Sequence, residues 1–398
     1  MIQPTVLNMA ARRAGRASEV VRFLRHRRHY PEGTRRVDVI ETHFAWIFLT
    51  DLHAYKLKKP VRRGRMDYTT SAARRQVCLD ELTLNRRLAP AVYLEVVPIT
   101  RSPEGTLAFG RHGRAPAQGS SADVVDWVVK MRRLPAARML DRALAARTLR
   151  KGDVRALASM LTRFFDGAVR QRLSESRYIE RMLERTVQNQ RDLCAPDLDL
   201  DTRLISRIGA MQVAFLEQRG MWVGARAAHL IDGHGDLRPE HIYLGSGSDP
   251  PCVIDCLEFD SDLRWVDPAE EIAFLALECR KLGAGAAARA LLAHYRVLTL
   301  TPPGAPLMDF YTSQSAMTRA KLAAWHVRDP ELASDAGLWR ARARSYLRVA
   351  ARDIRRALRP PQSGQDGSDS TAGLDDRPVL EQRRKRLPGQ HTTERLTE

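Results

Sequence analysis

The chain has 398 residues, which is long enough for two or three packed units, and its 44% of apolar residues is enough for a sizeable core. This composition excludes a wholly disordered chain, a collagen and a small disulfide-stapled protein. Lys and Arg outnumber Asp and Glu by 65 to 47, a net charge of +18, and all but eight of the cations are Arg. Such a charge is typical of proteins that bind nucleic acid or acidic membranes, but a genome rich in Arg codons explains it equally well.

Residues 1–36 form a basic N-terminal extension, with nine Arg against two Glu. Within it, Val20, Val21, Phe23 and Leu24 make a short amphipathic run. This run either touches an acidic lipid surface or RNA, or it is a frayed segment that leads into a first helix. We favour the second interpretation.

Hydropathy predicts no membrane span, because the sequence has no run of 18 or more uncharged apolar residues. The N-terminus also lacks the apolar centre of a signal peptide. The five cysteines are odd in number and are not closely paired, which argues against a secreted disulfide framework. We therefore expect a cytoplasmic protein with reduced thiols.

Residues 37–133 predict a small, mostly antiparallel sheet with one inserted helix, the N-lobe. Alternating or branched and aromatic residues mark the strands, and a polar turn at 50–53 joins two of them into a hairpin. Thr70 and Ser71 are residue types that cap helices, and a helix of about 19 residues follows, ending near Pro90. The predicted strands are 37–41, 44–49, 54–59, 92–100, 107–109 and 124–131.

Residues 134–358 predict a larger, mostly helical C-lobe, interrupted by loops and short strands at 226–267. The tail, 359–398, has few large apolar residues and predicts disorder. The sequence thus predicts an α+β, two-lobed protein. Its expected helices are 136–148, 152–170, 177–193, 200–219, 268–282, 284–298, 306–326 and 334–358.

The densest polar cluster of the chain is the segment 232–241, with the sequence DGHGDLRPEH. A short apolar run and a Gly- and Pro-bearing turn follow it, and then a predicted strand at 252–259. Polar groups beside two short apolar strands suggest a catalytic loop held by a hairpin. The turn lets Asp255 return beside Asp236 and His241.

The run His234-x-Asp236-x-x-x-x-His241 resembles the H-x-D-x-x-x-x-N catalytic loop of aminoglycoside phosphotransferases, choline kinases and other protein-kinase-like folds. The later Asp255 resembles the metal-binding aspartate of those proteins, so that 232–260 would hold both the catalytic loop and the metal-binding hairpin. The wider sequence, over about 37–330, resembles an uncharacterised bacterial branch of aminoglycoside phosphotransferase-like proteins. The matching segments are Ile40–His43, Tyr55–Pro60, Glu81–Arg87, Val129–Arg133 and Leu257–Phe259.

This resemblance implies an ATP-dependent phosphotransferase that acts on a hydroxyl of a small molecule. Phosphoryl transfer depends on positioning and on charge stabilisation more than on covalent help. Asp236 would accept the proton of the acceptor hydroxyl or orient it. Asp255 would bind Mg²⁺, and His234 would be a structural residue that bonds the backbone near Asp255.

The resemblance also implies a nucleotide site in the N-lobe. One lysine of the third strand, Lys56 or Lys58, would hold the α- and β-phosphates; we favour Lys58, because the family places an apolar residue before this lysine and a Pro two residues after it. Glu81 on the inserted helix would pair with that lysine. The segment at Met131 would bind adenine through backbone groups.

Two departures from the family pattern affect the expected activity. No Gly-rich phosphate loop is present, so the hairpin at 44–53 would have to cover the phosphates with backbone amides. His241 stands where the family has Asn, and an imidazole nitrogen suits Mn²⁺ or Zn²⁺ better than Mg²⁺. The expected cofactor is therefore Mg²⁺ or Mn²⁺ with ATP, and the alternative function is a nucleotide-binding pseudokinase or scaffold without transfer activity.

The sequence leaves other functions open, and other roles for the site residues. The Arg content alone would support salt-sensitive binding of RNA or DNA, but no aromatic-interleaved recognition motif accompanies it, so we expect no specific nucleic-acid partner. A metal-dependent phosphohydrolase would use His234, Asp236, His241 and Asp255 but would leave the N-lobe lysines without a role. Those lysines could instead lie on a solvated edge strand, and His241 could be a capping residue. The acceptor and the oligomeric state are not specified by the sequence.

Overall fold

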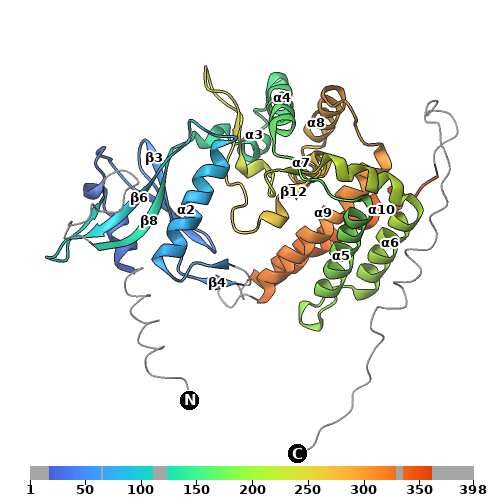
Figure 1. The fold of residues 1–398 in the computed structure, drawn as a ribbon, viewed down its shortest axis with the longest axis horizontal. Coiled ribbons are helices and arrows are strands. Elements are labelled where there is room, and N and C mark those ends of the chain that lie inside the picture. Colours follow the sequence, from blue (N-terminus) through green and yellow to red (C-terminus); the bar gives the residue numbers. More distant parts are fainter. Residues whose placement is uncertain (1–17, 64–65, 111–122, 329–334, 361–398) are drawn as a thin grey trace, which may run out of the picture. The chain divides into compact units, whose positions relative to one another are not determined.

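The computed structural model describes residues 18–63, 66–110, 123–328 and 335–360 (Figure 1). The described residues form two compact units, one from the segments Met1–Ser174 and Arg226–Gly304 and one from the segments Glu175–Ala225 and Ala305–Glu398. Among the described residues, no helix is long and apolar enough to cross a membrane. All five cysteines are free thiols, and four of them are buried.

The first unit contains a sheet of six antiparallel strands in the order β1-β2-β3-β8-β6-β7. Every strand predicted in residues 37–133 is found within about two residues of its expected bounds. The central pairing joins β3 to β8, with Ala54 opposite Met131 and Lys56 opposite Val129. The strands are β1 (Asp38–Glu41), β2 (Ala45–Leu49), β3 (His53–Lys58), β6 (Tyr93–Arg101), β7 (Leu107–Phe109) and β8 (Asp123–Arg132). A two-residue hairpin of β4 (Arg62–Arg63) and β5 (Met66–Asp67) was not predicted.

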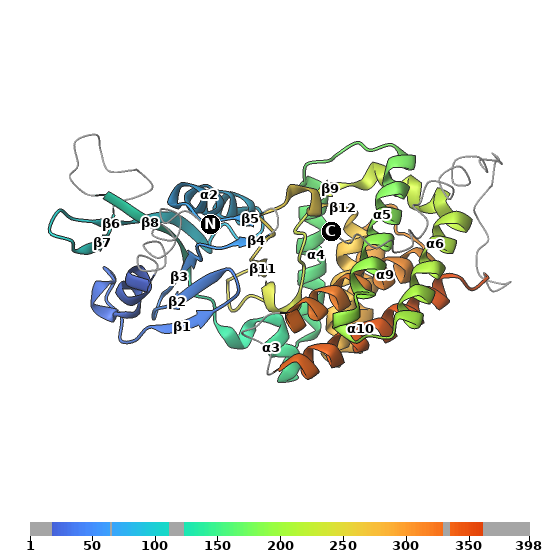
Figure 2. The same ribbon diagram turned by 90° about the horizontal axis from the view of Figure 1, so that it is seen from below.

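The inserted helix α2 (Ser71–Arg86) begins where the sequence predicts, because the side chain of Thr70 accepts a hydrogen bond from the Ala73 amide. It packs on one face of the sheet (Figure 2), where Cys78 joins a buried cluster with Ala54 and Val129. Arg74 forms a buried bidentate ion pair with Asp126 of β8. These contacts fix the helix on the sheet.

The other face of the sheet is covered by the N-terminal segment. Residues 18–25 are helical, and their apolar side chains are buried against Phe48, Tyr55 and Leu57. Glu32, farther along this segment, accepts hydrogen bonds from the Tyr55 hydroxyl and lies 2.9 Å from Nδ1 of His53. The described part of the expected extension 1–36 thus packs on the sheet, while 1–17 lies outside the described residues.

The rest of the first unit holds α3 (Leu140–Ala145), α4 (Lys151–Gly167), α7 (Pro268–Lys281) and α8 (Gly285–Leu298). Four two-residue strands lie between them: β9 (Ile231–Asp232), β10 (Ile242–Tyr243), β11 (Cys252–Val253) and β12 (Trp265–Val266). The expected helix 136–148 is shorter than predicted, and a single 3₁₀ turn at Ala136–Arg138 precedes it. The expected strand 252–259 is also wrong beyond Val253, because Asp255 has a left-handed φ of 61°, which ends an extended strand.

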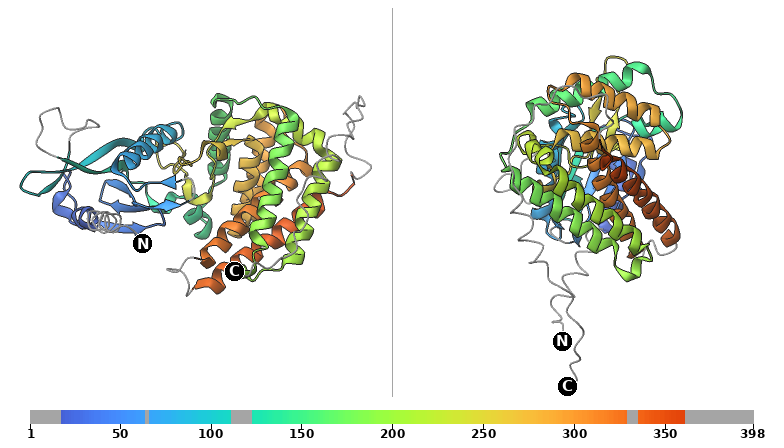
Figure 3. Two further views of the ribbon diagram at one scale, coloured as in Figure 1. Left: turned by 60° about the horizontal axis from the view of Figure 1, so that its bottom comes forward. Right: turned by 90° about the vertical axis from the view of Figure 1, so that its right-hand side faces the viewer.

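The second unit consists of α5 (Glu175–Leu193), α6 (Thr202–Gly224), α9 (Ala305–Trp325) and α10 (Ala336–Ala357). These helices lie alongside one another, α9 and α10 in orange and red beside α5 and α6 in green (Figure 3). All eight helices predicted in residues 134–358 are present, and the α+β class is confirmed. The predicted disordered tail, 359–398, lies outside the described residues except for its first two positions.

Candidate active site

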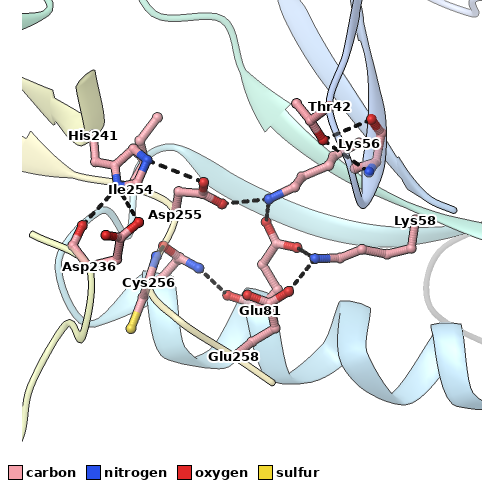
Figure 4. A network of polar contacts seen from close by, with 12 residues as sticks. Thr42, Lys56, Lys58, Glu81, Asp236, His241, Ile254, Asp255, Cys256 and Glu258 are labelled. Atoms are coloured by element: carbon pink, nitrogen blue, oxygen red, sulfur yellow. Dashed lines mark hydrogen bonds and ion pairs between the residues drawn. The ribbon is translucent and has the colours of Figure 1, made fainter. Parts of the chain in front are cut away.

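Two lysines of β3 meet one glutamate of α2. Lys56 and Lys58 point to the same face of the sheet because side chains along a strand alternate with a period of two. Lys56 Nζ lies 2.8 Å from Glu81 Oε1, and Lys58 Nζ lies 2.6 Å from Glu81 Oε2 (Figure 4). Glu81 is fully buried, and the positive charges of the lysines outweigh its burial and keep its pKa below the ordinary value.

The two lysines differ in their second partner. Lys56 Nζ donates to Asp255 Oδ1 at 2.6 Å, and Lys58 Nζ donates to Glu258 Oε1 at 2.5 Å. Burial opposes the charge of Lys56, but Asp255 and Glu81 outweigh it and raise the pKa of this amine. The ammonium groups therefore stay charged at neutral pH.

Asp255 is placed by the β10–β11 hairpin, whose second strand ends two residues before it. Its amide donates to the Tyr93 hydroxyl at 3.1 Å, and its left-handed backbone turns the carboxylate toward Lys56. Burial would raise the pKa of Asp255, but Lys56 and then His241 outweigh burial and hold this pKa well below its usual range. A strained backbone at a charged residue is a common property of functional sites.

The loop at 232–241, which the sequence predicts to be catalytic, brings Asp236 and His241 close to Asp255. Nδ1 of His241 lies 2.9 Å from the backbone oxygen of Asp236, and Nε2 lies 3.4 Å from Asp255 Oδ2. A carbonyl oxygen only accepts hydrogen bonds, so Nδ1 carries a proton and donates to Asp236. His241 thus connects Asp236 to Asp255.

His234 supports the loop from inside. Its ring is fully buried, Nε2 lies 2.9 Å from the Ile254 carbonyl oxygen, and Nδ1 accepts from the Asp236 amide at 3.2 Å. Burial lowers the pKa of His234 to about 4, so the ring is neutral at physiological pH. A buried neutral ring bonded on both nitrogens positions the backbone and is not available as a base.

Two residues near the catalytic loop were not singled out from the sequence. Arg238 Nε donates to Asp236 Oδ2 at 3.0 Å, and its Nη2 lies 3.1 Å from His241 Nε2. Glu271 of α7 accepts from the amides of His234 and Gly235 at 2.9 and 2.6 Å. The only available sequence signal for Glu271 was an acidic residue inside a strongly apolar helix.

The predicted adenine contact lies inside the sheet. Met131 is buried in β8, where it is paired with both Ala54 and Tyr93. The next amides, of Arg132 and Arg133, donate to the carbonyl oxygens of Val92 and Leu52. The side chain of Met131 is on the same face as Lys56, since Ala54 and Lys56 are two residues apart on β3.

Within the described part of the chain, no group of three or more His, Cys, Asp or Glu side chains is arranged to hold a metal ion. Asp255 and His241 supply two donors of different hardness, a carboxylate and an imidazole. Mg²⁺ in kinase-type sites uses one or two carboxylates together with substrate phosphates. The donors fit a metal that arrives with a nucleotide.

No protein-family model matches the chain. The chain is 31% identical over 306 residues to uncharacterised proteins of Mycobacterium tuberculosis and Mycobacterium bovis. The matched region is 75% of this chain, and the chain spans 57% of the length of those relatives.

Several solved structures have a related arrangement. A choline/ethanolamine kinase family protein from Mesorhizobium loti has a TM-score of 0.45 and 13% identity, covering 86% of this chain and 99% of that chain. An aminoglycoside phosphotransferase from Streptomyces rimosus, solved with ADP and streptomycin, has a TM-score of 0.40 and 14% identity, covering 71% and 92%. Plasmodium vivax ethanolamine kinase has a TM-score of 0.43 and 9% identity, covering 82% of each chain. The structural neighbours are thus aminoglycoside phosphotransferases and choline/ethanolamine kinase family proteins, and the sequence relatives are uncharacterised mycobacterial proteins.

Proposed function

We propose that the protein is an ATP-dependent phosphotransferase that phosphorylates a hydroxyl group of a small molecule. The observation that carries this proposal is one continuous polar network, Glu81–Lys56–Asp255–His241–Asp236. The network joins Lys56, a cation that can bind phosphate, to Asp255, a carboxylate that can bind a metal, and to Asp236, a carboxylate that can accept a hydrogen bond from a hydroxyl. Phosphoryl transfer needs these three functions close together.

Lys56 is the better candidate for the nucleotide phosphates, although the sequence pattern favoured Lys58. The side chain of Lys56 is 12% exposed and that of Lys58 is 2% exposed. Lys58 is enclosed between Glu81 and Glu258, whereas Lys56 already contacts Asp255, the proposed metal ligand. A phosphate at the metal would therefore meet Lys56 first.

Asp255 would hold Mg²⁺ or Mn²⁺, and Nε2 of His241 would be the second protein donor. A bound divalent ion supplies charge neutralisation at the nucleotide phosphates. The imidazole favours Mn²⁺ relative to the amide oxygen of Asn. The turn at 42–44, between β1 and β2, would lie over the phosphates in place of the expected hairpin at 44–53. It adjoins Ala45, the β2 residue that pairs with Lys58, whereas the turn of that hairpin lies at the other end of β3.

Asp236 would orient the acceptor hydroxyl and take its proton. The hydroxyl oxygen forms a bond to the γ-phosphorus, the bond from that phosphorus to the β,γ-bridging oxygen breaks, and ADP leaves with the bond's electron pair. The proton passes to Asp236 Oδ and then to solvent. Arg238 donates to Asp236 Oδ2 and would orient this carboxylate. Use of ATP agrees with the expected cytoplasmic location.

A second candidate is a nucleotide-binding protein that does not transfer phosphate. It is supported by His241 at the position of the usual Asn and by the contact of Arg238 with the same ring nitrogen that would bind a metal. In this candidate Lys56 and Asp255 still bind nucleotide, but the second metal position is not formed.

Isothermal titration with ADP and ATP, in Mg²⁺ and separately in Mn²⁺, tests nucleotide binding. The wild type and Asp255→Asn are compared, with Lys59→Met as the control, because Lys59 pairs with Glu41 outside the network. We expect metal-dependent binding that Asp255→Asn weakens by about tenfold or more and that Lys59→Met leaves unchanged. A wild type that binds neither nucleotide in either metal would contradict both candidates.

A further inference from the structure

The carboxylate of Asp232, at the start of the catalytic loop, lies between two guanidinium groups. Arg87 Nη1 donates to Asp232 Oδ2 at 2.9 Å, and Arg264 Nε donates to Oδ1 at 2.7 Å. Arg87 directly follows helix α2, and Arg264 directly precedes β12. The three residues come from three separate segments, and all three side chains are largely buried.

Arg87 also bonds the backbone of the loop. Its Nη1 donates to the Asp232 carbonyl oxygen at 2.8 Å, and its Nη2 donates to the Gly233 carbonyl oxygen at 2.9 Å. Its Nε donates to the carbonyl oxygen of Leu84 in α2, at 3.0 Å. The planar guanidinium therefore joins the end of α2 to two successive residues of the loop, a geometry that the flexible single ammonium of lysine cannot reproduce.

Helix α2 carries the other half of the site. Glu81 holds Lys56, and Asn85, one turn later, accepts from the Cys256 amide at 2.8 Å. Asp236 follows Asp232 by four residues and Gly233 by three. Arg87 thus connects the helix that positions the proposed phosphate and metal groups to the loop that positions the proposed base.

We propose that Arg87, with Asp232 as its partner, is a positioning residue that couples the nucleotide half of the site to the catalytic loop. The inference rests on the proposed function and deepens it. With this connection in place, α2 and the loop move together, and a nucleotide bound at Lys56 and Asp255 orders Asp236. Without it, the nucleotide still binds, but the start of the loop is no longer bonded to α2, while His234 and His241 still connect the loop to the Asp255 segment.

The neighbouring Arg86 supplies a matched control. Arg86 Nε donates to the Tyr93 carbonyl oxygen at 3.0 Å, and its Nη2 bonds the Leu94 carbonyl oxygen, so this arginine holds α2 only to β6. Arg86→Met and Arg87→Met each remove one guanidinium group, with its positive charge and its hydrogen-bond donors, and the two positions are adjacent. Only the second variant removes a bond to the catalytic loop.

The test is hydrogen exchange of the 233–237 amides with and without ADP and Mg²⁺, together with ADP affinity by isothermal titration. In the wild type and in Arg86→Met we expect ADP to slow exchange in the loop. In Arg87→Met we expect ADP affinity within about threefold of wild type, at most about half of the wild-type slowing of loop exchange by ADP, and ATP hydrolysis reduced by about tenfold or more. Arg87→Lys should restore only part of the slowing.

Loop protection by ADP that is as strong in Arg87→Met as in the wild type would overturn the inference. If Arg87→Met does not fold, Asp232→Asn replaces it, because Asn keeps the shape and removes the charge that Arg87 binds. A wild type that does not bind ADP contradicts the proposed function instead. In that case the role of Arg87 is tested by hydrogen exchange of the 233–237 amides without ADP. Equal exchange of these amides in Arg86→Met and Arg87→Met would overturn the inference.

Discussion

Lys56 Nζ lies 2.6 Å from Asp255 Oδ1, although 199 residues separate the two along the chain. This contact joins the third strand of the sheet to the segment after the β10–β11 hairpin, and Glu81 holds the lysine from the other side. Both ends are charged at neutral pH, because the opposite charge of each partner outweighs burial in setting the pKa of Lys56 and that of Asp255. The pair is therefore already arranged to hold an anionic ligand and a cation.

Removal of Lys56 and removal of Lys58 should have different effects, one on ADP binding and the other on stability. Lys56→Met should weaken ADP binding by about tenfold or more, with little loss of stability, because Glu81 keeps Lys58 as a partner. Lys58→Met should lower the free energy of unfolding by about 3–5 kcal/mol, because it leaves Glu258 buried without its cation. Titration calorimetry measures ADP binding and urea denaturation measures stability. If Lys58→Met weakened ADP binding and Lys56→Met lowered stability instead, Lys58 would be the phosphate ligand.

The metal preference should depend on His241. In His241→Asn an amide oxygen replaces the ring nitrogen that faces Asp255, so the ratio of activity in Mg²⁺ to activity in Mn²⁺ should rise by about tenfold. The amide nitrogen can still donate to the Asp236 carbonyl, which keeps the loop in place. Steady-state ATP turnover in each metal provides the ratio. An unchanged ratio would mean that this position does not touch the metal.

Glu271 should make the stability of the protein depend on pH. Burial raises the pKa of Glu271 to about 7, and its Oε2 has no hydrogen-bond partner among the residues that the structure describes. The folded state binds this proton more tightly than the unfolded state, so the stabilisation is complete below the unfolded pKa, near 4.5, and is lost as the pH rises to 7. Arg87 and the two loop amides favour the charged form but do not outweigh burial.

In Glu271→Gln this dependence should disappear. The amide oxygen can still accept from the His234 and Gly235 amides, and no proton has to be lost. The variant should match the wild type near pH 4.5 and exceed it by at most about 3 kcal/mol at pH 8. Urea unfolding at four or five pH values provides the comparison. A variant that is less stable than the wild type at pH 8 would contradict a raised pKa.

Gly233 should tolerate no side chain. A Cβ at this position would lie 2.7 Å from Val266 Cγ2 and 3.1 Å from the Glu271 carboxyl carbon, so the loop would have to move. Gly233→Ala should destabilise the protein by about 1–3 kcal/mol and lower ATP turnover. Gly152→Ala in α4 is the control, because its Cβ meets nothing within 4 Å. Equal stability of the two variants would show that the loop adjusts without cost.

Much of the fold could be predicted from hydrophobic periodicity. The expected helix 177–193 is found as Glu175–Leu193, because its apolar stripe has the helical period and is buried in the second unit. The strand predicted at 252–259 could not be corrected from the sequence, since Asp adopts a left-handed backbone only occasionally and no local pattern marks Asp255 as one such case. Local pattern identifies elements, and tertiary contacts decide where they stop.

The sequence identified which residues form the site better than it identified what each of them does. Lys56 and Lys58 share a strand face, so periodicity cannot separate them, and only their second partners, Asp255 and Glu258, distinguish them. Arg87 is one of many arginines in the chain, and nothing local marks it as the one that binds the catalytic loop. The high positive charge likewise did not indicate the site, which contains more carboxylates than lysines.

The transfer of the γ-phosphate is the most direct test of the central proposal. The wild type and Asp236→Asn are incubated with γ-labelled ATP, Mg²⁺ or Mn²⁺, and a pool of small metabolites, and labelled products are separated by mass. We predict a labelled small molecule with the wild type, and loss of that product in Asp236→Asn while ADP affinity stays within about threefold. A wild type that binds ATP but labels no small molecule, or an Asp236→Asn variant that labels it at the wild-type rate, would contradict the account.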